Sequence, residues 1–132
     1  MHACPIVLIA CEAAELEALR RLVPAKAHVV TANSVAYAVE RLRGRVDAVI
    51  CSMDFDDSRM LELVREAHVQ RPEVPVLCCR VFGSPISDLS FRAAATAAFS
   101  VGVAAFADLA NRASILGADT TELAATLVRL LG

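Results

Sequence analysis

The hydrophobic positions of the chain alternate between two patterns. One pattern is a short, mostly apolar run, and it occurs five times, at residues 6–10, 28–32, 46–51, 76–81 and 103–107. The first run is continuous, which is typical of a parallel strand that is covered on both faces. The sequence therefore predicts five strands of a largely buried sheet.

The other pattern places apolar side chains at helical spacing in the segments between these runs. Breakers end several of the helical segments, among them Pro24, Gly44 and Gly102. A helix is also expected at about 87–100, and the last helix has the apolar face Leu123, Leu127, Leu130 and Leu131. Five strand–helix units predict an α/β domain with a doubly wound parallel sheet and helices on both faces. At 132 residues, the chain is expected to form a single domain over residues 1–132.

The net charge and the hydropathy of the chain indicate which kinds of partner it binds. A formal net charge of −2 gives no electrostatic case for nucleic acid or for an anionic membrane surface. Apolar residues make up 57% of the chain and the mean hydropathy is +0.55, so part of the apolar surface is expected to meet a protein partner. The uncharged segment 93–107 is shorter than the roughly 18–20 apolar residues that a membrane span needs.

Five cysteines occur without the spacing of a zinc site. Four of them, Cys11, Cys51, Cys78 and Cys79, lie in or at the end of strand runs, where a free thiol acts as a small hydrophobic group. A redox pair or a soft-metal site remains an alternative, with Cys11 and Cys79 the closest candidates. No signal peptide is evident at the N-terminus, and we expect a cytoplasmic protein without metal or other cofactor.

Ligands of such sheets gather at the carboxyl ends of the strands, near the point where the strand order reverses. The residues at these ends are 10–12, 52–57, 80–82 and 107–110. They include Glu12, Asp54, Asp56 and Asp57, whose carboxylates suggest either a hard-cation site or acids that favour the start of a helix. We interpret the aspartates as helix-start acids.

The order and spacing of these segments resemble the receiver domain of two-component response regulators, over nearly the whole chain. The similar stretches are IVLIACEAAELEALRRLV, VDAVICSMDFDDSRMLELVREAHVQRPEVPVLCCRV and AAFSVGVAAFADLA. The resemblance implies a flavodoxin-like sheet of strand order 2-1-3-4-5. It also implies a signalling role in a two-component system or phosphorelay, which is not that of an enzyme.

The residues that perform phosphoryl transfer in that family are replaced here. By the resemblance, the two metal-binding acids fall on Ala10 and Cys11, with only Glu12 acidic beside them. The phosphoacceptor aspartate falls on Ser52, the hydroxyl after strand four on Arg80, and the Lys-Pro pair on Leu109 and Ala110. The sequence thus indicates a degenerate pseudo-receiver that acts as a protein-interaction or dimerisation module.

Two alternatives follow from the same residues. Asp54 could replace Ser52 as a phosphoryl acceptor with Mg²⁺, because residues two apart on a strand point the same way. A small molecule or nucleotide could instead bind at the carboxyl ends of the strands, since this topology does not fix function. For Arg80, we expect an internal ion pair with Asp54, Asp56 or Glu12.

A protein partner and a homodimer are expected at the surface formed by the fourth helix, the fifth strand and the last helix. The candidate interface residues are Ala94, Ala98, Phe106 and Leu127, and Phe106 stands where the family has its switch aromatic. Residues 111–118 form an insertion relative to the family's usual spacing. It would lengthen the surface beside the last helix.

Overall fold

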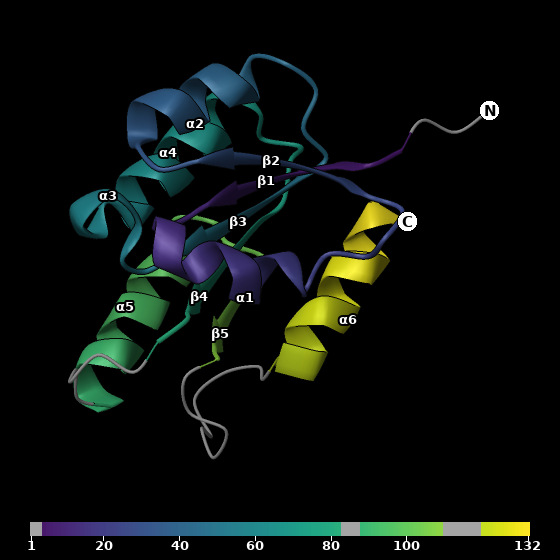
Figure 1. Cartoon of the computed structure of the whole chain (residues 1–132). Coiled ribbons are helices and arrows are strands. Elements are labelled where there is room, and N and C mark those ends of the chain that lie inside the picture. The colour runs from purple at the N-terminus through teal and green to yellow at the C-terminus, as the bar shows by residue number, and fades with distance from the viewer. Residues whose placement is uncertain (1–3, 83–87, 110–119) are drawn as a thin grey trace.

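A five-stranded parallel sheet forms the centre of the computed structural model of the chain (Figure 1). The structure describes residues 4–82, 88–109 and 120–132, and of residues 88–90, 120 and 121 it describes the backbone alone. The strands are β1 (Ile6–Ala10), β2 (His28–Ala32), β3 (Ala48–Ser52), β4 (Val76–Arg80) and β5 (Ala105–Asp108). Their order is β2-β1-β3-β4-β5, which confirms the predicted order 2-1-3-4-5. The insertion expected at 111–118 lies outside the described residues.

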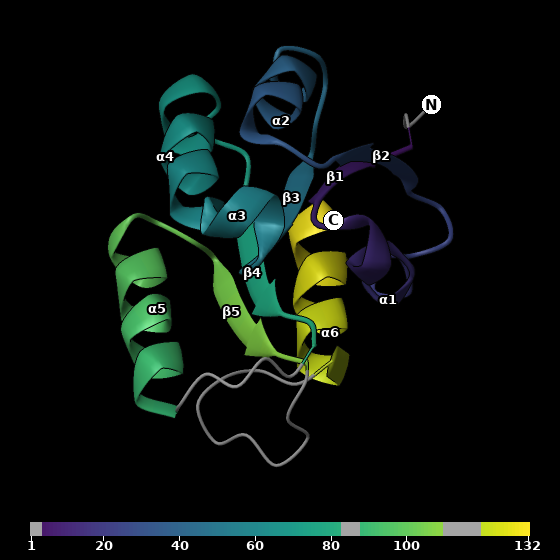
Figure 2. The same ribbon diagram turned by 60° about the vertical axis from the view of Figure 1, so that its left-hand side comes forward.

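Helices cover both faces of this sheet. They are the 3₁₀ turn η1 (Ala13–Glu15), α1 (Leu16–Arg20), α2 (Val35–Leu42), the short turn α3 (Phe55–Ser58), α4 (Met60–Gln70), α5 (Asp88–Ser100) and α6 (Thr120–Leu131). Figures 1 and 2 show α2, α4 and α5 on one face and α1 with α6 on the other. Each face has its own apolar core, so the predicted doubly wound architecture is confirmed. None of the helices in the described residues has the length and apolar content needed to cross a membrane.

Strands β1 and β2 have the predicted bounds, and the bounds of β3, β4 and β5 differ from the prediction by one or two residues. The third and fifth strands begin at Ala48 and Ala105, two residues later than predicted. Before β5, the N–H of Val103 donates to the carbonyl of Ala98 at 3.3 Å, so this residue closes α5 rather than joining the sheet. On α6, Leu130 was predicted to face the core, but it is exposed, because the inward stripe runs through Leu123 and Leu127.

The turn α3 has a left-handed backbone at three consecutive residues. The φ angles of Asp56, Asp57 and Ser58 are 47°, 54° and 64°. Side chains make this region unfavourable, at roughly 1–2 kcal/mol per residue, although aspartate is among the more tolerant residues. The strained turn ends where α4 begins at Met60, so it separates the aspartates from that helix.

The aspartates are therefore not acids of the first turn of α4, and that interpretation was wrong for Asp56. Its Oδ2 instead accepts the backbone N–H of Val35, the first residue of α2, at 2.8 Å. The carboxylate thus lies at the N-terminus of a different helix, where the helix dipole favours a negative charge. This contact joins the loop after β3 to α2.

We predict that Asp57→Gly stabilises the fold. Glycine adopts a φ of 54° without a Cβ clash, so the free energy of unfolding should rise by about 0.5–1 kcal/mol. Urea unfolding measures the change. The matched control is Asp54→Gly, at a φ of −88°, where glycine only adds freedom to the unfolded chain and should lower stability. Equal effects of the two substitutions would contradict the strained turn.

Candidate functional site

The carboxyl ends of β1, β3 and β4 bring most of the predicted site residues together. In the sheet register Ala10 pairs with Cys51, Ser52 with Cys79, and Arg80 with Asp108. Ala10, Cys11, Ser52 and Arg80 are buried, Glu12 and Leu109 are half-buried, and Asp54 is exposed. Ala110 lies outside the described residues. The site is therefore mostly closed to solvent, and its one exposed member is Asp54.

Ser52 is engaged by a carboxylate that the sequence analysis did not single out. Its hydroxyl is fully buried and donates to Oε1 of Glu15 at 2.6 Å. The same oxygen accepts the backbone N–H of Glu12 at 2.9 Å, and Glu15 is itself only 2% exposed. Its second oxygen, Oε2, has no hydrogen-bond partner among the described residues. The side chain of Glu15 thus covers the end of β3 from the α1 face.

Two sequence signals could have identified Glu15. It follows Glu12 by three residues, the spacing of a capping box, in which the later side chain accepts the earlier N–H. It also shares the inward face of the turn with Leu19 and Leu22, at helical spacing. A charged residue on an apolar face is rarely buried without a partner. Finding that partner required the contact between segments 37 residues apart.

Glu12 links the loops around the site. Its Oε1 accepts the backbone N–H of Asp56 at 3.1 Å, and the carboxylate of Asp56 in turn binds the N-terminus of α2. Nη1 of Arg59 lies 3.8 Å from Oδ2 of Asp56. The Arg59 side chain is largely exposed, so this ion pair is expected to contribute little to stability. Both acidic side chains therefore hold loops in place.

Arg80 pairs with a different acid from those predicted. Its Nε donates to Oδ1 of Asp108 at 3.0 Å, and its Nη2 donates to Oδ2 of the same carboxylate. The expected pair with Asp54, Asp56 or Glu12 was wrong, because the register places Asp108 directly beside Arg80 on the neighbouring strand. Both side chains are buried, with 8% and 2% of their surfaces exposed. A bidentate pair of this kind combines charge with fixed geometry.

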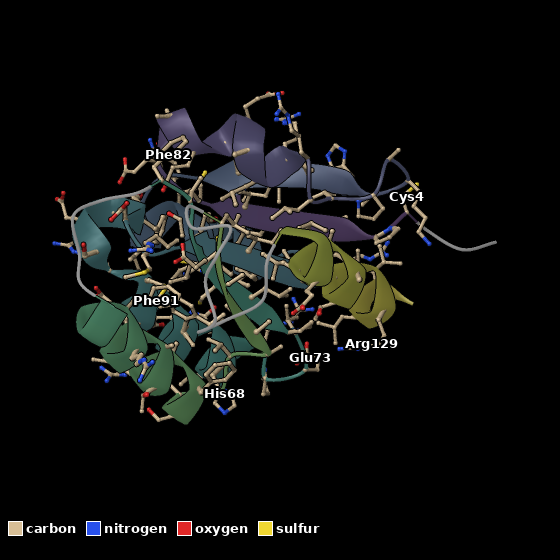
Figure 3. All side chains as sticks on the ribbon, turned by 90° about the horizontal axis from the view of Figure 1, so that it is seen from below. Cys4, His68, Glu73, Phe82, Phe91 and Arg129 are labelled. Carbon is tan, nitrogen blue, oxygen red and sulfur yellow. The ribbon has the colours of Figure 1, made fainter. Side chains whose placement is uncertain are left out.

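Aromatic rings extend this pair toward α5. The guanidinium carbon of Arg80 lies 5.0 Å from the centre of the Phe91 ring, a cation–π distance. The Phe91 ring meets Phe106 of β5 edge to face, with 5.2 Å between centres and 79° between planes. Figure 3 shows Phe91 at the side of α5 that faces the sheet. The ion pair and two rings therefore connect β4, β5 and α5.

Asp54 does not continue the direction of Ser52. The strand ends at Ser52, and the chain turns at Asp54, with φ −88° and ψ 1°. The alternation of a strand therefore does not apply to this residue, and that part of the prediction was wrong. Asp54 instead lines an open pocket of about 260 Å³ beside the sheet. The other lining residues are Met53, Ser58, Met60, Leu61, Arg80 and Ala94.

These residues do not fit the magnesium ion that receiver domains use. Mg²⁺ requires several oxygen ligands in near-octahedral geometry. At the metal-binding positions stand the methyl group of Ala10 and the thiol of Cys11, and burial raises the pKa of that thiol to about 12. Nowhere in the described residues do three or more His, Cys, Asp or Glu side chains form a group that could hold a metal.

The buried thiols are packing groups. Burial raises the pKa of Cys78 to about 12 and raises the pKa values of Cys51 and Cys79 well above the usual 9.0, so all stay protonated near neutral pH. Cys11 and Cys79 flank β3 and share one core. Two strand spacings, about 9.5 Å, separate such positions, whereas a disulfide needs Cα atoms closer than about 7 Å. The redox-pair alternative was wrong for this pair.

Three of the four candidate interface residues lie inside the domain. Ala98, Phe106 and Leu127 are buried in the two cores, and Ala94 is half-buried against one of them. The prediction was wrong for these three buried residues, because their side chains pack into the cores between the sheet and its helices. The exposed large apolar side chains of the described residues are Tyr37, Val69, Phe82, Phe99, Val128 and Leu130.

Comparison with solved structures supports the fold. No protein-family model matches the chain, and none of the curated proteins matches it. A signal receiver domain of an HD domain-containing protein from Pseudomonas fluorescens superposes with a TM-score of 0.71 at 23% identity, over 99% of this chain and 89% of that chain. A CheY-like response regulator receiver domain protein from Methanospirillum hungatei superposes with a TM-score of 0.71 at 13% identity, over 98% of this chain and 94% of that chain.

A third similar structure is that of a receiver domain in an activated state. The BeF3-activated DrrB receiver domain superposes with a TM-score of 0.69 at 14% identity, over 98% of both chains. At these identities the likeness concerns the fold. The chain has the flavodoxin-like fold of CheY-type response regulator receiver domains.

We predict that only Cys4 reacts with iodoacetamide at pH 8 in the folded protein. Cys4 is exposed and the other four thiols are buried and protonated. Intact mass should show one adduct in the native state and five in urea. Cys4→Ser should remove the native adduct. Rapid labelling of Cys11 or Cys79 would contradict their role as packing groups.

We predict that Arg80→Ala destabilises the domain by about 3–5 kcal/mol, because it leaves the buried carboxylate of Asp108 without its guanidinium. Thermal and urea unfolding measure the loss. The double variant Arg80→Met/Asp108→Asn should lose less unfolding free energy than the sum of the losses of Arg80→Met and Asp108→Asn made singly, because the two side chains are coupled. Arg59→Ala, at an exposed ion pair, is the control and should change stability little. Additive losses would argue against a coupled pair.

Proposed function

We propose that the chain is a receiver-like module that binds a protein partner in signalling without accepting a phosphoryl group. The observation that carries the proposal is the closed end of β3, where the Ser52 hydroxyl is fully buried and bonded to Glu15. A hydroxyl in this state has no room for a phosphoryl donor. A serine would in any case form a phosphate ester rather than a reactive acyl phosphate.

The charge balance of the site supports the same proposal. In a phosphoryl-accepting receiver, a metal ion and an ammonium group neutralise the incoming charge. In this chain the guanidinium of Arg80 is neutralised by Asp108, and the carboxylates of Glu12 and Asp56 hold backbone N–H groups. On this proposal, the Arg80–Asp108 pair and the carboxylate-to-backbone bonds take the place of the contacts that a phosphoryl group would make. The helix α5 and the strand β5 would then keep one arrangement, which a partner recognises without phosphorylation.

We infer that this partner is a regulatory protein or a second copy of the chain, and that the module acts in the cytoplasm. Val69 of α4 and Phe99 of α5 are 79% and 54% exposed. Between these two helices lies an open pocket of about 460 Å³, lined by Arg65, His68, Val69, Ser100, Val101 and Gly102. Exposed apolar residues beside a hollow are common in protein interfaces.

Phosphorylation of Asp54 is a second candidate, because Asp54 is exposed and lines a pocket with Arg80. The two candidates separate in one experiment. The protein is incubated with acetyl phosphate and Mg²⁺, and its intact mass, melting temperature and light-scattering mass are compared with those of the untreated sample. A conventional receiver is treated in parallel, and Asp54→Asn is the matched variant.

We expect no adduct and no change in melting temperature or oligomeric state, while the conventional receiver is labelled. The reason is that Arg80, Glu12 and Asp56 are already engaged in an ion pair or hydrogen bonds within the protein. An adduct of about 80 Da that disappears in Asp54→Asn would overturn the proposal and assign the acceptor role to Asp54.

A further inference from the structure

A second pocket lies at the carboxyl ends of β1 and β2, away from Ser52 and Arg80. Its volume is about 320 Å³. The lining residues are Cys11, Glu12, Ala13, Leu16, Thr31, Ala32, Asn33, Tyr37 and Arg41. They come from the segment after β1, from η1 and the start of α1, from the end of β2 and the residue after it, and from α2. We call this hollow the α2 pocket.

A backbone hydrogen bond and two buried residues form the floor of the α2 pocket. The backbone N–H of Cys11 donates to the carbonyl of Ala32 at 3.2 Å, which joins the chain after β1 to the end of β2. Cys11 and Ala32 are both buried, so their small side chains form a closed surface under the opening. On the α2 side, the Ser34 hydroxyl caps the helix by accepting the N–H of Tyr37 at 3.2 Å. The residues that surround the pocket are thus held by the fold before any ligand arrives.

Two side chains of α2 line this pocket and have no hydrogen-bond or ion-pair partner among the described residues. Tyr37 and Arg41 are four residues apart, so they lie on one face of the helix. The Tyr37 side chain is 66% exposed, and the cation–π contact found in the described residues is that of Arg80 with Phe91. The Arg41 side chain makes no hydrogen bond or ion pair with the described residues. Its neighbours differ, because Arg43 pairs with Glu40 at 3.1 Å and Arg45 with Asp47 at 3.2 Å.

The lining carries one basic and one acidic residue, Arg41 and Glu12. They come from different elements, because Arg41 lies on α2 and Glu12 follows β1. Oε1 of Glu12 is bonded to the N–H of Asp56, so an anionic ligand would bind on the α2 side of the pocket, at Arg41. The exposed side chains of Thr31 and Asn33 add hydroxyl and amide groups at the rim. Apolar contact is supplied by Leu16 and Ala13 across from α2.

We propose that the α2 pocket binds a small planar aromatic anion, with its ring against Tyr37 and its anionic group on Arg41. A guanidinium binds carboxylates and phosphates in bidentate geometry, and an exposed aromatic ring stacks on another ring. The volume is at the lower end of the range for ligand pockets, which limits the ligand to about one ring with its substituents. The anionic group is a carboxylate or a phosphate ester. The site would make the module responsive to a metabolite.

The test is a titration of the full chain followed by ¹H–¹⁵N NMR. The probes are 4-hydroxybenzoate and phenyl phosphate, and 4-hydroxybenzamide is the neutral control of the same shape. We expect saturable shifts at the amides around residues 11–16 and 31–41, with a dissociation constant below about 1 mM for at least one anion. A preference for one anion identifies the group as carboxylate or phosphate.

The matched variants are on α2. Arg41→Ala should weaken binding by about tenfold or more, whereas Arg43→Ala, whose side chain pairs with Glu40, should leave it unchanged. Tyr37→Leu keeps an apolar side chain at an exposed position and should weaken binding through loss of the ring. Equal binding of the amide, equal binding by Arg41→Ala, or unsaturable shifts would overturn the proposal. None of these results depends on phosphorylation, because the α2 pocket does not include Ser52, Arg80 or Asp54.

Discussion

The buried ion pair of Arg80 and Asp108 constrains the half of the domain that carries β4, β5 and α5. Two charges removed from water are costly unless each finds its partner in good geometry, and here the sheet register supplies that geometry. The backbone repeats the same alignment, since the N–H of Leu109 donates to the carbonyl of Arg80 at 2.8 Å. Phe91 then covers the guanidinium from α5. A shift of β5 by one residue would separate the charges, so the pair selects a single register.

On the other face, Glu15 plays a comparable part at the end of β3. Its carboxylate connects the Ser52 hydroxyl to the turn after β1, and Glu12 and Asp56 carry the connection on to α2. The result is a set of loops held by carboxylate-to-backbone bonds in the region where phosphoryl-accepting receivers bind a metal. The left-handed turn at residues 56–58 is the local cost of this arrangement. Strain of this kind persists where surrounding contacts determine the backbone.

These two networks give the proposed function its physical basis. A switch needs two arrangements that differ by a few kcal/mol and a ligand that favours one of them. Here the guanidinium of Arg80 is paired with Asp108, and the carboxylates of Glu12 and Asp56 accept backbone N–H groups. The proposed function therefore relies on surfaces that stay open, which are the exposed apolar residues of α4 and α5 and the α2 pocket.

The sequence determined the fold of this protein, because the alternation of apolar runs and helical stripes reports which faces are buried. The second strand was predicted residue for residue, and the strand order followed from the family resemblance. Most residues of the candidate site, though not Glu15, could also be named, because strand ends converge at one edge of a parallel sheet. Which acid meets which partner could not be predicted.

Tertiary structure alone decided those pairings. Arg80 meets Asp108 rather than Asp54 because of the β4–β5 register, and Glu15 reaches Ser52 because the turn after β1 folds over β3. It also decided that Phe106 and Leu127 lie inside the domain. The physical reason is that apolar burial is local and periodic along the chain, whereas a hydrogen bond or ion pair joins atoms whose separation is set only when distant segments have packed together.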